Sequence, residues 1–107
     1  MARTVYSAVF YAASGISSPV TMFTVPAGEV WVVRDIDAYN NAGASMSDIY
    51  FVDSVSNGTF FYGKVAAASK DTVQWRGRQV FTFGGGAYVN PNGSNWDVRV
   101  SGYRLLV

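Results

Sequence analysis

Cysteine and histidine are both absent from the 107 residues of this chain. Without cysteine there is no disulfide, no thiolate nucleophile and no thiolate ligand for a metal. Without histidine the chain lacks the commonest general base and the commonest metal ligand. No serine stands in a recognised catalytic motif, so an acid–base triad cannot be assembled. We therefore predict no enzyme activity, no metal and no cofactor.

Charged residues are also scarce. They make up 14% of the chain, where about a quarter is usual. The eight basic and seven acidic residues give a net charge of +1, and the basic ones are scattered. This gives no electrostatic case for binding nucleic acid or a membrane surface. A surface so poor in charge predicts that part of it is covered by another molecule, through oligomerisation or assembly.

No apolar run approaches the length of a transmembrane helix. The first fifteen residues, MARTVYSAVFYAASG, superficially resemble a signal peptide. Thr4, Tyr6, Ser7 and Tyr11 interrupt the apolar core of that segment, which favours an edge strand instead. We therefore predict no membrane insertion.

Strand signals fill the rest of the chain. Half of its residues are apolar and 16% are aromatic, enough to form the core of one domain, residues 1–107. Turn signals recur roughly every ten residues, with no amphipathic helix pattern, which predicts an all-β antiparallel β-sandwich or barrel of about eight short strands. Asn57-Gly58 is the strongest hairpin signal. The expected strands cover residues 4–11, 20–25, 30–39, 48–52, 59–62, 72–75 with 79–83, 87–89 and a last one from Trp96.

The longest uninterrupted strand signal, residues 30–39, is expected near the centre of a sheet. Its alternation is imperfect, because neither parity is wholly apolar. A β-bulge near Arg34-Asp35 would bring Val33 to the same side as Ile36 and leave the charges at the kink or on the outer face.

The last strand alternates cleanly at first, with Trp96 on its apolar side. Gly102 then interrupts the pattern, and Tyr103 and Leu105 continue it on the other parity. This predicts a second bulge, located in the last strand itself.

Asp35 and Asp37 share one strand face and have two interpretations. They are either an acid pair or cation site, or the charges of a solvated strand face. No further oxygen ligands follow at a recognised spacing, and outward-facing charges are the ordinary case. The solvated face is therefore the preferred interpretation.

Aromatic residues fall on both parities of some strands, as in Phe60-Phe61-Tyr62. A two-layer sandwich buries one face of each strand, so one set of rings is expected to meet a neighbouring subunit or a sugar. The alternative is a core ring plus an incidentally exposed one. The candidates for an interface or glycan-stacking surface are Phe60, Tyr62, Trp75, Arg76, Arg78 and Tyr88.

Three segments resemble a known group of proteins: TVPAGEVWVVRDIDAYNN at 24–41, WRGRQVF at 75–81 and VRVSGYRLL at 98–106. The chain resembles small β-rich virion structural proteins of tailed bacteriophages, especially those infecting actinobacteria. It departs from their pattern at Phe81, where a smaller aliphatic residue is usual, and at the long glycine turn 84–86. The resemblance implies a jelly-roll-like module on the virion exterior, at the tail tip or on the capsid shell, often as a trimer.

The leading hypothesis is a non-enzymatic structural subunit of a phage virion, either a minor tail or tail-tip protein or, as a close variant, a capsid decoration protein. Its expected partners are further copies of itself, with a homotrimer favoured, and other virion proteins. A carbohydrate-binding module that attaches the particle to host glycans is the second hypothesis. A hydrolase is a distant third.

Overall fold

The computed structural model describes residues 4–41, 46–66, 70–92 and 95–107. Within these ranges every regular element is a strand, and no helix is long and apolar enough to cross a membrane. The strands are β1 (Thr4–Ile16), β2 (Val20–Thr24), β3 (Glu29–Asn40), β4 (Ser47–Asp53), β5 (Thr59–Val65), β6 (Thr72–Phe81), β7 (Gly86–Asn92) and β8 (Trp96–Leu106).

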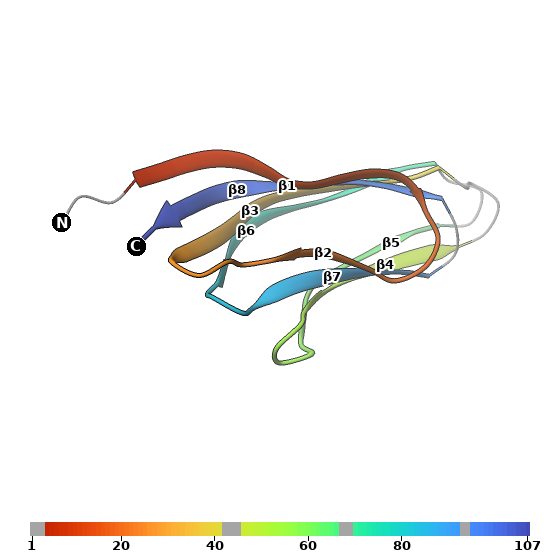
Figure 1. The fold of residues 1–107 in the computed structure, drawn as a ribbon. Helices are drawn as coiled ribbons and strands as arrows, with labels where there is room; N and C mark the ends of the chain where they lie inside the picture. Colours follow the sequence, from red (N-terminus) through yellow and green to blue (C-terminus); the bar gives the residue numbers. More distant parts are fainter. Residues whose placement is uncertain (1–3, 42–45, 67–69, 93–94) are drawn as a thin grey trace.

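The strands form two four-stranded antiparallel sheets stacked face to face (Figure 1). Their orders are β1-β8-β3-β6 and β2-β7-β4-β5. The chain changes sheet at every connection except β4 to β5, which is the pattern of the jelly roll. The predicted antiparallel β-sandwich of jelly-roll type is therefore confirmed. The predicted β4–β5 hairpin is present. Its loop, residues 54–58, contains Asn57 with a φ of 57°, but Gly58 has no positive φ, so the turn is not the two-residue Asn-Gly type.

Strand β3 lies in the interior of its sheet, between β8 and β6, as predicted. Against β8 it has one extra residue between Val33 and Asp35, so the expected bulge is present at Arg34. Its register with β6 shifts at the same place, but there the extra residue lies in β6. As a result Val33 and Ile36 are both completely buried, although they lie three positions apart and would face opposite sides of a regular strand. The bulge is what allows both halves of this long strand to contribute to one core.

The predicted bulge in β8 is wrong. Its alternation continues through Gly102, which is buried, and Tyr103 points outward with 38% of its surface exposed. The extra residues lie in its neighbours instead: Phe10 in β1 and Arg34 in β3. A Cβ atom at Gly102 would overlap the carbonyl oxygen of Val32, so this glycine gives the kinked neighbour room to pass.

Phenylalanine and tryptophan rings pack against one another within a core that is otherwise rich in valine and isoleucine. Phe23 links the two sheets at one end, 5.1 Å from Trp31 and 5.2 Å from Phe81 between ring centroids. Phe60 continues the series, 5.7 Å from Phe81 and 5.8 Å from Trp75 in edge-to-face contacts. This geometry is favourable for ring quadrupoles, so a continuous aromatic layer joins the β2 side of the sandwich to the β5–β6 side.

Glu29 anchors the start of β3 to the end of β8. Its carboxylate accepts hydrogen bonds of 2.9 Å from the Trp31 indole and from the Arg104 guanidinium. The same guanidinium lies 5.6 Å from the Trp31 ring centroid. The hydrogen bond from Trp31 lowers the pKa of Glu29 against the opposing effect of burial, and Arg104 lowers it further.

Trp96 is the largest side chain that is fully buried. Its indole nitrogen finds no hydrogen-bond partner in the described part of the chain, so its stabilising role is packing alone.

Trp96→Ala should lower the free energy of unfolding by about 3–5 kcal/mol, measured by urea denaturation with an unchanged m-value. Phe83→Ala, at a ring that is 69% exposed, is the control and should change stability by no more than about 0.5 kcal/mol. A loss below about 1 kcal/mol for Trp96→Ala would contradict the packing described here.

Gly102→Ala tests the close approach of β8 to β3. The added methyl group has no space unless the backbone moves, so we expect a loss of about 3 kcal/mol in the same assay. Ser101→Ala, one residue earlier and pointing outward, should stay within about 0.5 kcal/mol of the parent. Equal effects of the two substitutions would show that the bulge does not require glycine at its partner position.

Candidate interaction surfaces

The outer faces of the two sheets carry different side chains. The outer face of β1-β8-β3-β6 is here named the charged face, after Arg34, Asp35, Asp37, Arg76 and Arg99. The outer face of β2-β7-β4-β5 is named the tyrosine face; its tyrosines are Tyr50, Tyr62 and Tyr88. Tyrosine suits an outer face because its hydroxyl remains hydrated while its ring presents apolar area.

Arg76 on β6 clamps the two carboxylates of β3. Its Nε atom lies 3.3 Å from Asp35, and a terminal nitrogen lies 2.9 Å from Asp37. The hydrogen bond to Asp37 raises the pKa of Arg76. The two carboxylates are 47% and 38% exposed, which confirms the preferred interpretation as a solvated strand face. Across the described residues no group of three or more acidic side chains could hold a metal ion.

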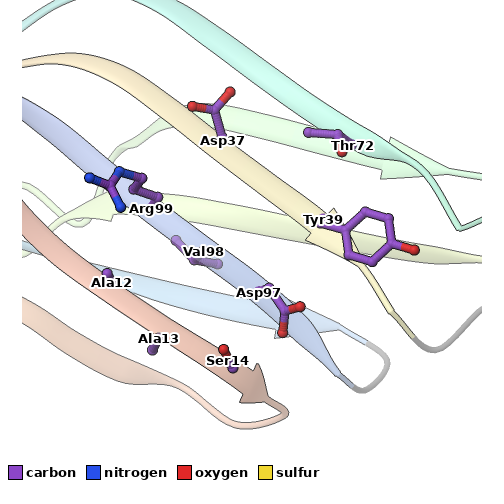
Figure 2. Close-up of a pocket in the computed structure, with 9 residues that line it drawn as sticks. All are labelled: Ala12, Ala13, Ser14, Asp37, Tyr39, Thr72, Asp97, Val98 and Arg99. Atoms are coloured by element: carbon purple, nitrogen blue, oxygen red, sulfur yellow. The ribbon is translucent and has the colours of Figure 1, made fainter.

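A shallow hollow of about 540 Å³ crosses the charged face at the end of β3 (Figure 2). Its β1 side is formed only by the small residues Ala12, Ala13 and Ser14, whereas Asp37 and Tyr39 rise from β3 on the other side. A second hollow, of about 350 Å³, continues along β1 and shares Arg99 with the first; its lining includes Ser7, Ala8, Val9, Arg34 and Ser101. The hollows arise because the short side chains of β1 lie beside the longer ones of β3. Such open hollows suit contact with the surface of another protein, whereas a small substrate is usually bound in an enclosed pocket.

The charged face is apolar at its other end. Tyr103 stands there with the guanidinium of Arg34 5.8 Å from its ring centroid. Val32 lies beneath and is only 5% exposed although it points outward. Arg78 and Leu105 complete the lining of a third hollow, of about 280 Å³.

The tyrosine face is centred on a pair of rings. Tyr50 on β4 is directly opposite Tyr62 on β5, with ring centroids 4.8 Å apart. The Tyr62 hydroxyl donates a 3.0 Å hydrogen bond to Asp48. Partial burial raises the pKa of Tyr62, and the hydrogen bond to Asp48 raises it further. Tyr88 lies one row away, opposite Val52.

The six sequence-based candidates do not share one surface. Tyr62 and Tyr88 lie on the tyrosine face, while Arg76 and Arg78 belong to the strand at the edge of the other sheet. Phe60 and Trp75 lie on neither outer face: both are half-buried and pack against the core, in contact with each other.

Two local features turn these rings inward. A register shift in β5 makes Phe60 an extra residue, so Phe60 and Phe61 both face the core and Tyr62 alone points out. The indole of Trp75 lies over Gly77, where a Cβ atom would come within 2.7 Å of it. The rings thereby close the side of the sandwich where β5 meets β6.

Sequence reasoning missed three residues that shape these faces: Tyr50, Arg99 and Tyr103. The signal was present for two of them. Tyr50 stands between the buried Ile49 and Phe51, and Arg99 likewise alternates with buried valines. Tyr103 was misassigned because Gly102 was interpreted as a break in phase.

Neither a protein-family model nor a curated protein matches the chain. Among solved structures, it is similar to a mutant VP2 protein of infectious bursal disease virus in T=1 particles, at a TM-score of 0.45 and 12% identity, covering 97% of this chain and 32% of that one. A VP2 subviral particle of the same virus gives 0.44 and 10%, covering 98% and 33%. The chain spans about a third of the length of these structures, and likeness at this level concerns the fold alone.

Proposed function

We propose that this protein is a non-enzymatic structural subunit on the exterior of a tailed-phage virion. A minor tail or tail-tip position is favoured, with a capsid decoration protein as the close variant. The resemblance of residues 24–41, 75–81 and 98–106 to phage virion proteins supports the particle type. Density from intact virions would show which part of the particle carries the chain.

The amino-acid composition of the charged face is the main observation that supports a structural role. Its four strands contain no lysine, and their outward cations are all arginines. Arginine and tyrosine are enriched in protein interfaces and lysine is depleted, because guanidinium and phenol groups pack well and lose little entropy. Tyr103 adds apolar area and is 38% exposed. The face is therefore suited to contact with other virion proteins and with further copies of the chain.

Self-association is the first test, with a homotrimer as the favoured state. Light scattering after size exclusion should give three times the 11.6 kDa of one chain, or a whole multiple of that mass. Tyr103→Ala should raise the dissociation constant at least tenfold if Tyr103 is part of that interface, because truncating a central aromatic residue typically costs more than about 1 kcal/mol. Phe83→Ala, at an exposed ring outside both faces, should leave it unchanged. A monomer at every concentration would contradict self-association.

The tyrosine face favours a second function, attachment to host glycans. The Tyr50 and Tyr62 rings offer a stacking platform, with Tyr62 45% exposed. Asp48 lies beside them with a carboxylate that accepts hydrogen bonds, and Asn90 is the cross-strand neighbour of Tyr50. Sugar rings use this combination, since their C–H faces stack on aromatic rings while their hydroxyls pair with polar side chains.

A glycan array probed with the labelled protein tests this second function. We expect at least one glycan to bind and Tyr62→Ala to reduce its affinity at least tenfold, since stacking and the bond to Asp48 are lost together. Tyr103→Ala removes an exposed tyrosine from the opposite sheet and should bind as the parent does. An array with no bound glycan would contradict glycan attachment and leave the structural role intact.

A further inference from the structure

The edges of the two sheets are not equally protected. Each edge strand presents main-chain N–H and C=O groups that a strand of another molecule can pair with, and proteins normally block such pairing with charges, prolines, short strands or covering elements. The edges here are β1 and β6 in one sheet and β2 and β5 in the other.

Three of these edges carry protection. Strand β6 bears Arg76 and Arg78 and packs against β5, where Gly63 approaches Val73. Strand β5 carries Lys64 and is covered by the same contact. Strand β2 has only five residues and lies between Pro19 and Pro26.

Strand β1 has almost no protection against pairing with a strand of another molecule. Its 13 residues, TVYSAVFYAASGI, contain no charged residue and no proline. It runs along the border of its sheet (Figure 1), and within the described ranges β8 is the only strand that pairs with it. Its protective devices are two register shifts, one at Phe10 and one between Ala13 and Ile16, which leave an unbroken register from Thr4 to Val9.

We infer that β1 pairs antiparallel with β1 of a second copy, along Thr4–Val9. The occupant of this edge must be an extended strand, and among the described edges β1 alone is longer than ten residues or free of charge over more than five residues. A two-fold axis satisfies both copies at once, since each strand then offers and receives the same main-chain groups. The two four-stranded sheets become one continuous sheet of eight. The pair closes at two copies, so any trimer contact uses another surface, and this inference does not depend on the virion assignment.

Single cysteines test the pairing directly, because the chain has none of its own. A disulfide needs Cα atoms about 4.4–6.8 Å apart, which opposite positions on paired strands provide. Ser7→Cys and Val9→Cys, oxidised singly and as a mixture of the two, should give a disulfide-linked dimer on non-reducing gels. We expect formation at least tenfold faster in one of these samples than in Val80→Cys. That control is 47% exposed against 48% for Val9, on the opposite edge of the same sheet.

Ser14→Cys, also exposed but beyond the bulge, separates strand pairing from random collision and should cross-link as slowly as Val80→Cys. A lysine at the same edge gives an independent measurement: Val9→Lys should raise the dissociation constant of the dimer at least tenfold, and Val80→Lys should not. Cross-linking no faster at positions 7 and 9 than at 80, or dissociation by Val80→Lys but not by Val9→Lys, would overturn the inference.

Discussion

The kink that crosses β1, β8 and β3 is the constraint on which the rest of this structure depends. The kink crosses β8 near Ser101 and Gly102. At this position each of the two strands that flank β8 has one extra residue: Phe10 in β1 and Arg34 in β3. Without the extra residue in β3, alternation would expose either Val33 or Ile36. Gly102 makes the arrangement possible, since any side chain would collide with the kinked strand.

Bulges of the same kind determine which aromatic side chains face the core and which face the surface. Bulges in β1 and β5 turn Phe10 and Phe60 inward, where they join Phe23 and Trp31 in one packed layer. Tyrosines occupy several of the outward positions, and their hydroxyls remain accessible to hydrogen-bond partners, as the bond from Tyr62 to Asp48 shows. The aromatic residues of the described ranges thus contribute to one packed core and to two outer faces.

Local features of the sequence predict much of this fold. The number of strands, the Asn57-Gly58 hairpin, the interior position of β3 and its bulge all follow from patterns within about ten residues. The misassigned features depend on a strand distant in sequence. Gly102 is needed because of the backbone of Val32, and the orientation of Phe60 depends on its register with β4. The six candidate residues were grouped by side-chain type, but the sheet order distributes them over two faces and the core.

Pairing through β1 would also change what the charged face can contact. Directly opposite residues of antiparallel strands point to the same side of a sheet, so the charged faces of two copies would lie on one side of the joined sheet. The hollows beside β1, lined there by Ser7, Val9 and Ala12, would then border the two-fold axis from both copies and form one wider trough. The small side chains of β1 would thus have two consequences: they leave the edge open to main-chain pairing, and they leave room above it for a third molecule. A surface built in this way becomes complete only on assembly, which accords with the structural role proposed above.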